Sequence, residues 1–156
     1  MIKKNVYLVD MGSGSNMNLL PLAIGMIGSY SLEQQEIQKN FNIEYRFLRQ
    51  KRDALAASMD DPVVIGFSCY VWNFRGSLSA AKEIKKRFPK ALIVLGGFSI
   101  PKIPARITQF FLEHPYVDVL VHGEGELTFA NFLRQHMGDQ QYHEVQGLTY
   151  KTPDTP

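Results

Sequence analysis

Cysteine, long apolar runs and net charge are all scarce in this sequence of 156 residues. The single cysteine, Cys69, excludes a disulfide within the chain. It also excludes a zinc or iron–sulfur site made of cysteine alone, because such sites need three or four thiolates. No run reaches the roughly 18 apolar residues of a membrane span. The opening MIKKNVYLVD holds too short an apolar stretch for a signal peptide, so we expect a cytoplasmic protein.

The charge balance and the spacing of the histidines exclude further kinds of partner and site. The chain has 17 Lys and Arg against 15 Asp and Glu, and the formal charge of +2 indicates neither a nucleic-acid nor a membrane partner. The histidines are scattered without the spacing of metal ligands, so we expect no dedicated metal site. They are His114, His122, His136 and His143.

Short apolar runs alternate with helical patterns along the chain. Hydrophobic residues make up 45% and charged residues 21%, which is typical of one globular domain. The apolar runs predict strands over residues 6–9, 43–48, 63–67, 92–95 and 117–121. The patterns between them predict helices over residues 22–35, 52–59, 77–87, 104–112 and 126–136.

This order predicts an α/β fold with a parallel sheet and helices on both faces. The runs VVIGF, LIVLG and VDVLV are nearly continuous in Val, Ile and Leu, as in strands buried on both faces. The run IEYRFL alternates, which suits an edge strand. We therefore expect a five-stranded, flavodoxin-like (Rossmann-like) sheet in the order 2-1-3-4-5, with EVQGLTY as a candidate extra C-terminal strand.

Glycines gather where the predicted strands end, which is where ligands bind in such sheets. Gly96 and Gly97 would leave bare backbone against which a flat ligand can lie. Gly123 and Gly125 would open a helix N-terminus with free N–H donors. Ordinary tight turns between strands and helices are the alternative reading of each pair.

The loop after the third strand carries aromatic side chains. Tyr70 and Trp72 either cap the core or pack against a large ligand. Ser68 either donates its hydroxyl to a ligand or caps the strand end. Cys69 is expected to be a small buried filler rather than a nucleophile, because no histidine is near it in sequence.

The segment Gly12-Ser13-Gly14 invites a nucleotide-binding interpretation. A dinucleotide fingerprint needs a third glycine where Met17 stands and an acidic residue at the end of the second strand, which instead reads Phe47-Leu48-Arg49. The opening DMGSG is similar to that of class I S-adenosylmethionine-dependent methyltransferases, but the ribose-binding acid is again absent. A small nucleotide- or S-adenosylmethionine-binding enzyme remains an alternative.

Taken together, the segments PLAIGMIGSY, GFSCYVWN, LGGFSIP and VDVLVHGEGELTF resemble the N-terminal cobalamin (B12)-binding domain of B12-dependent radical SAM enzymes. The resemblance runs from about Val6 to Leu133 and implies a flavodoxin-like domain. It implies a corrinoid, methylcobalamin or hydroxocobalamin, across the strand ends, with its nucleotide tail beside Ser68, Gly96 and Gly97. The implied cofactor-binding residues are Gly12, Ser13, Gly14, Ser68, Tyr70, Trp72, Gly96, Gly97, Phe98, Gly123, Glu124 and Gly125.

Two departures from related motifs shape the expected role. The loop DMGSGSNMNLL has no histidine where other corrinoid domains carry DxHxxG, so we expect base-off cobalamin without a protein histidine on cobalt. Its lower face would be covered by the loops after the first and third strands. The chain also lacks the CxxxCxxC motif of a radical SAM barrel, so the 4Fe–4S cluster and S-adenosylmethionine would belong to a partner domain, in cis or in trans.

We therefore expect the corrinoid module of a radical SAM enzyme, with methyl transfer as the expected activity, and with no complete active site and no catalytic residue of its own. Residues 1–141 would form the cobalamin-binding domain, and residues 142–156, ending in KTPDTP, a tail or linker toward the barrel. The alternative is a relative that kept the fold, lost the cofactor and acts as an interaction domain.

Overall fold

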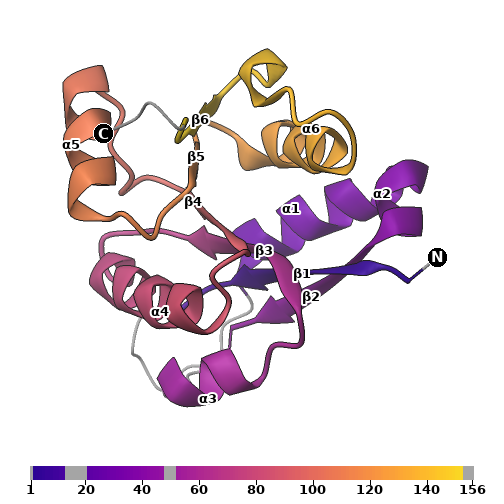
Figure 1. The fold of residues 1–156 in the computed structure, drawn as a ribbon, viewed down its shortest axis with the longest axis horizontal. Helices are drawn as coiled ribbons and strands as arrows, with labels where there is room; N and C mark the ends of the chain where they lie inside the picture. Colours follow the sequence, from indigo (N-terminus) through magenta and orange to yellow (C-terminus); the bar gives the residue numbers. More distant parts are fainter. Residues whose placement is uncertain (1, 13–20, 48–51, 153–156) are drawn as a thin grey trace.

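The sheet of this α/β protein has six strands, one more than predicted. The computed structural model describes residues 2–12, 21–47 and 52–152. Figure 1 shows its elements, which in chain order are β1 (Lys4–Val9), α1 (Leu22–Glu33), α2 (Gln35–Asn40), β2 (Phe41–Arg46), α3 (Arg52–Ala57), β3 (Pro62–Ser68), α4 (Phe74–Arg87), β4 (Leu92–Gly96), α5 (Pro104–Glu113), β5 (Val119–Val121), α6 (Gly125–Met137), a 3₁₀ turn (Tyr142–Glu144) and β6 (Leu148–Tyr150).

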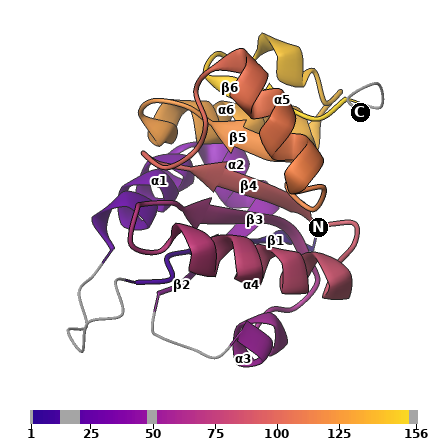
Figure 2. The ribbon, with the colours of Figure 1, turned by 90° about the vertical axis from the view of Figure 1, so that its left-hand side faces the viewer.

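The first five strands are parallel and the sixth is antiparallel. The strand order is β2-β1-β3-β4-β5-β6, and Figure 2 shows the strands stacked in this order. The predicted order 2-1-3-4-5 is confirmed, whereas the count of five is wrong. The candidate C-terminal strand forms as β6 and pairs with β5. It spans only three half-buried residues, too few for a clear periodicity.

Helices cover both faces of the sheet, as predicted, and each face has its own apolar core. On one face Leu55, Ile84 and Phe110 come from α3, α4 and α5. On the other, Ile24, Ile37 and Phe132 come from α1, α2 and α6. Figure 1 shows α3, α4 and α5 on one side of the sheet and α1, α2 and α6 on the other. Within the described ranges, no helix combines the length and the apolar character needed to cross a membrane.

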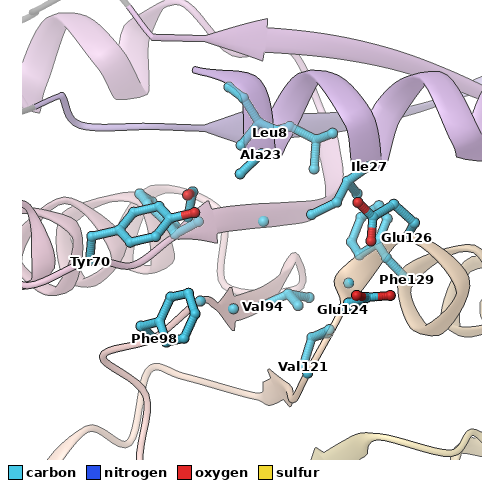
Figure 3. A pocket seen from close by; sticks show the side chains of 18 of the residues that line it. Leu8, Ala23, Ile27, Tyr70, Val94, Phe98, Val121, Glu124, Glu126 and Phe129 are labelled. Carbon is cyan, nitrogen blue, oxygen red and sulfur yellow. The ribbon is translucent and has the colours of Figure 1, made fainter.

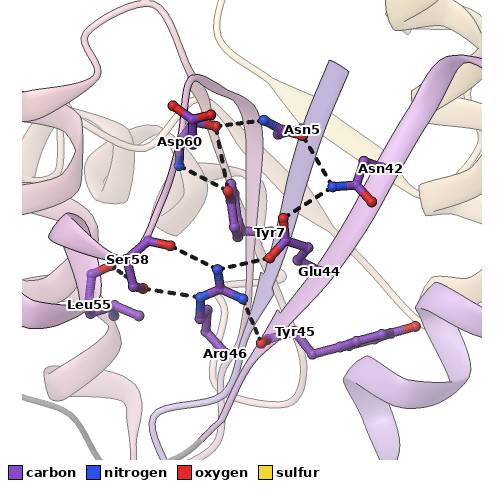
Figure 4. Close-up of polar contacts among 9 residues, drawn as sticks. All are labelled: Asn5, Tyr7, Asn42, Glu44, Tyr45, Arg46, Leu55, Ser58 and Asp60. Carbon is purple, nitrogen blue, oxygen red and sulfur yellow. Dashed lines mark hydrogen bonds and ion pairs between the residues drawn. The ribbon is translucent and has the colours of Figure 1, made fainter. Parts of the chain in front are cut away.

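Arg46 connects the edge strand β2 to β1 and to the chain after α3 through hydrogen bonds and a ring contact (Figure 4). The Arg46 guanidinium donates to the Glu44 carboxylate at 2.9 Å and to the Ser58 backbone carbonyl at 2.8 Å. It also lies over the Tyr7 ring, 4.8 Å from its centroid. The Tyr7 hydroxyl in turn accepts from the Asp60 backbone N–H at 2.9 Å. These contacts fix the β2 edge and the chain that follows α3.

Two glycines lie in the helix that the sequence predicts over residues 22–35. The helix α1 ends at Glu33, because Gln34 has extended backbone, and α2 follows. A Cβ at Gly28 would overlap the phenol of Tyr45, so this glycine lets α1 lie close to β2. Gly25 has no such neighbour among the described residues. The helix α1 packs against β1 and β2 on this face of the sheet.

Candidate functional site

A cavity of about 400 Å³ lies between the sheet and the helices α1 and α6 (Figure 3). Its walls are mostly apolar. The strands contribute Leu8, Val94 and Val121 to the lining, while Ile27 and Phe129 come from α1 and α6. Ligand pockets typically have volumes of about 300–1,000 Å³ and this kind of lining. We refer to this cavity as the tail pocket.

Gly66 creates the depth of the tail pocket. Leu8, Gly66 and Val94 are direct neighbours across β1, β3 and β4. A Cβ at Gly66 would lie 3.0 Å from Leu8 Cδ2 and 3.6 Å from Phe129 Cε2. Any side chain there would therefore fill the space that Gly66 leaves open. Gly66 is not among the predicted site residues, although a glycine inside a strand is a signal of close approach.

The next row toward the strand ends continues this opening. Ser68 pairs with Gly96, and Gly96 pairs with Val121. Because alternate residues of a strand share a face, Gly66 and Ser68 line the same side of β3. Both strand ends thus carry small residues beside the pocket, and Ser68 is only 6% exposed. Ser68 and Gly96 line the pocket at the positions where the sequence predicts ligand contact.

Gly97 lines the pocket and also allows the loops after β3 and β4 to lie close together. It has a φ of +102°, and a Cβ there would lie 2.5 Å from the Cys69 carbonyl oxygen. The Cys69 N–H donates to the Gly96 carbonyl at 2.8 Å, and the Ser99 N–H donates to the Cys69 carbonyl at 3.2 Å. A glycine is thus required for the loop geometry itself, so the turn interpretation of Gly97 is correct alongside its place in the lining.

The turn between β5 and α6 supplies Gly123, Glu124 and Gly125 to the lining. A Cβ at Gly125 would lie 3.0 Å from Ile27 Cδ1, so Gly125 lets α6 begin close against α1. Glu124 precedes α6 without a side-chain capping bond, so capping does not account for it. Figure 3 shows Glu124 and Glu126 near Phe129. Their carboxylates therefore supply polar groups on the α6 side of the pocket.

Three rings form an aromatic cluster, Tyr70–Trp72–Phe98, beside the pocket. Tyr70 and Trp72 stack with centroids 4.8 Å apart and planes 6° apart, and Phe98 lies 6.3 Å from Tyr70. Trp72 is 59% exposed and Phe98 is 81% exposed, so the interpretation of Trp72 as a core cap is wrong. Tyr70 and Phe98 line the pocket, whereas Trp72 stacks on Tyr70 and is not part of the lining. Large exposed rings in a cluster are typical of a binding surface.

Asn73, which is not among the predicted site residues, holds the loop after β3 in place. It is 3% exposed. Its Oδ1 accepts from the Tyr70 N–H at 2.8 Å, and its Nδ2 donates to the Ser68 carbonyl at 3.0 Å. The same Nδ2 lies 3.4 Å from Asp10 Oδ1, which also accepts from the Gly12 N–H at 2.7 Å. Asn73 thus connects the loops after β1 and β3.

The single cysteine is not a nucleophile. Cys69 is fully buried, and burial raises the pKa of its thiol to about 12. Since the thiolate is the reactive form, the side chain is inert near neutral pH. This is the small buried filler that the sequence predicts.

The loop after β1 contributes none of its described residues to the lining. Gly12 has a φ of +65° and is absent from the lining, while Ser13 and Gly14 lie outside the described residues. Lys102 lines the pocket, although no pattern in the sequence singles it out, and its ammonium lies 5.2 Å from the Phe98 ring centroid. In the part of the chain that the structure describes, no three acidic, His or Cys side chains are grouped as metal ligands.

The family of the chain follows from comparison with known proteins. A family model of the B12 binding domain matches residues 26–133. The chain therefore belongs to the B12-binding domain family, and the resemblance predicted from its motifs is confirmed.

Two curated relatives are 37% identical to this chain over 150 residues, which is 95% of the chain and 21% of each relative. One is the 2-(S-pantetheinyl)-carbapenam-3-carboxylate methyltransferase of Streptantibioticus cattleyicolor, and the other is the cobalamin-dependent radical SAM methyltransferase TokK of Streptomyces tokunonensis. The chain thus spans about a fifth of the length of these relatives.

A solved structure shares the fold. It is the cobalamin-dependent S-adenosylmethionine radical enzyme OxsB with aqua-cobalamin and S-adenosylmethionine bound. The match has a TM-score of 0.75 and 20% identity, and it covers 99% of this chain and 21% of OxsB. At this identity the likeness establishes the fold alone.

Proposed function

We propose that the chain binds base-off cobalamin, with the nucleotide tail of the cofactor in the tail pocket. The observation that carries this proposal is the opening that Gly66 leaves in the middle of a row of Leu and Val side chains. The match to the B12-binding domain family supports it independently.

The residues present fit such a group. The apolar walls suit an aromatic base, and the missing side chain at Gly66 makes a cradle that a Cβ would fill. Polar groups that suit the phosphate, sugar and amide atoms of the tail stand near the strand ends: the Ser68 hydroxyl, the Lys102 ammonium and the Glu124 carboxylate. Bare backbone at Gly96 and Gly97 allows the tail to pass.

The aromatic cluster Tyr70–Trp72–Phe98 would lie beneath the corrin ring. Its exposed rings offer an apolar surface that would be shielded from water by a large flat ligand. Gly12, Ser13 and Gly14, in the loop after β1, would flank the same ring. Because this loop contains no histidine, we propose that cobalt has no protein imidazole on its lower side. When bound, as methylcobalamin or hydroxocobalamin, the cofactor supplies cobalt that can carry a methyl group.

We further propose that the chain acts as the corrinoid module of a radical SAM methyltransferase. The names of the two relatives, and the small share of their length that this chain spans, support this role. The barrel, the 4Fe–4S cluster and S-adenosylmethionine would then belong to a partner domain, in cis or in trans. The division at residue 141 remains a prediction. Because β6 belongs to the sheet, the part that can act as a linker would follow Tyr150.

The test replaces Gly66 with Val and measures retained hydroxocobalamin after desalting. We expect the wild-type chain to stay coloured and Gly66→Val to retain at least tenfold less, because the Val side chain occupies the tail pocket. Gly25→Ala is the matched control, since a Cβ there meets no described atom within 4 Å. Gly97 is unsuitable, because its φ of +102° makes any substitution distort the loop.

Circular dichroism establishes that each variant is folded. A folded Gly66→Val chain that retains as much cobalamin as the control contradicts the placement of the tail. A folded wild-type chain that stays colourless favours the alternative of an interaction domain without cofactor.

A further inference from the structure

Among the described residues, no hydrogen-bonding side chain lines the inner part of the tail pocket. Its strand side is the row Leu8, Gly66 and Val94, and its helix side includes Ile24 and Phe129. The strands β1, β3 and β4 pair with one another along this row, so their backbone N–H and C=O groups are engaged in the sheet. A group placed here meets only carbon atoms of the described side chains.

The polar lining residues lie farther along the strands or beyond them. Ser68 stands one row closer to the strand ends than Gly66, and Tyr70 and Lys102 follow the ends of β3 and β4. The remaining two, Glu124 and Glu126, belong to the start of α6. The pocket therefore divides into an apolar inner part and a polar outer part.

We infer that the tail pocket selects the base of the corrinoid tail, accepting dimethylbenzimidazole and discriminating against adenine. This inference rests on the proposed function. Dimethylbenzimidazole carries methyl groups and a single free ring nitrogen, for which the Ser68 hydroxyl is a donor. Adenine carries several free ring nitrogens and an amine, and the inner pocket leaves these without partners. Buried polar groups without partners weaken binding, whereas methyl groups in an apolar pocket strengthen it.

The test compares three corrinoids on the wild-type chain by equilibrium dialysis: cobalamin, its adenine-containing analogue pseudocobalamin, and cobinamide, which lacks the nucleotide tail. We expect cobalamin to bind about ten- to a hundredfold more tightly than pseudocobalamin. We expect cobinamide to bind more weakly than cobalamin as well. Equal affinities for cobalamin and pseudocobalamin overturn the inference. Equal affinities for cobalamin and cobinamide also overturn it, since the tail would then contribute nothing. If no corrinoid binds, the proposed function itself has failed.

A variant assigns the selectivity to the pocket. Val94→Thr keeps the side-chain shape and adds a hydroxyl to the inner pocket, so we expect the ratio of the two affinities to fall about threefold or more. Ile93→Val is the matched control, because Ile93 lies on the same strand but packs in the core of the opposite face. The control should keep the wild-type ratio. An unchanged ratio in a folded Val94→Thr chain overturns the assignment.

Discussion

Removing the Asn73 side chain should loosen both loops beside the pocket. Asn73→Ala deletes the acceptor of the Tyr70 N–H and the donor to the Ser68 carbonyl, at 2.8 and 3.0 Å. It also deletes the longer contact to Asp10. Alanine can replace none of these contacts, and the Ser68 carbonyl has lost a partner in a buried setting. The loop would then hold Tyr70 and Trp72 less firmly.

The expected loss follows from these bonds. A hydrogen bond contributes about 0.5–1.5 kcal/mol net, and a buried group left without a partner costs about 1–3 kcal/mol. For Asn73→Ala we therefore expect the free energy of unfolding to fall by about 2–4 kcal/mol. In a domain of this size each kcal/mol lowers the melting temperature by about 2–4 °C, so a fall of about 4–16 °C is expected.

Urea unfolding followed by circular dichroism measures this change. Asn42→Ala is the matched control, because Asn42 is exposed on the edge strand β2 and its amide donates to the side chains of Asn5 and Glu44. We expect the control to change the free energy of unfolding by less than about 0.5 kcal/mol. Asn73→Ala should also retain less hydroxocobalamin than the control. A change in Asn73→Ala as small as that of Asn42→Ala would refute the argument that Asn73 organises the loops.

Three further predictions concern single residues. Gly25→Ala should raise the free energy of unfolding by about 0.5–1 kcal/mol in a urea titration, because alanine favours a helix and meets no obstacle there; a loss would contradict the open environment of Gly25. Cys69, with a pKa near 12 and no exposed surface, should react with a thiol reagent at pH 8 only after unfolding, and fast labelling of the folded chain would count against its burial. Burial lowers the pKa of His136 below 6.5, so the unfolded chain binds the proton more readily. The contribution of neutral His136 to the free energy of unfolding should therefore be fully present above about pH 6.5 and be lost as the pH falls below it. In urea titrations at several pH values, His136→Gln should show a shallower decrease in stability with falling pH. An unchanged slope would contradict this origin.

The central strands can be predicted from the sequence because each is a local run of apolar residues. Their order follows from the alternation of strands with helices and from the edge-like second strand. The runs around Val64, Ile93 and Leu120 are apolar enough to be recognised as buried parallel strands. The strand β6 is different, because its position depends on pairing with β5 and not on its own three residues. A short, half-polar segment carries no clear periodicity, so tertiary pairing decides whether it forms a strand.

The loop glycines of the site could be predicted, whereas the pocket behind them could not. Gly96, Gly97 and Gly123 stand where strands end, and topology alone brings these ends together. The role of Gly66 depends on its lateral neighbours Leu8 and Val94, which are far from it in sequence. Likewise, the burial of Asn73 and the exposure of Trp72 are set by tertiary packing, which residue type does not reveal.

The central claim is that the chain holds cobalamin without a protein ligand on the lower side of cobalt. Electron paramagnetic resonance of the chain loaded with cobalamin and reduced to cob(II)alamin tests it most directly, because a coordinated nitrogen splits each cobalt line into three. We predict a cob(II)alamin spectrum with cobalt hyperfine lines and no such splitting. A threefold splitting would show a nitrogen ligand and would contradict this claim. A histidine as its source would contradict the absence of a protein ligand, whereas the tail base as its source would contradict the base-off state and the placement of the tail in the pocket beside Gly66.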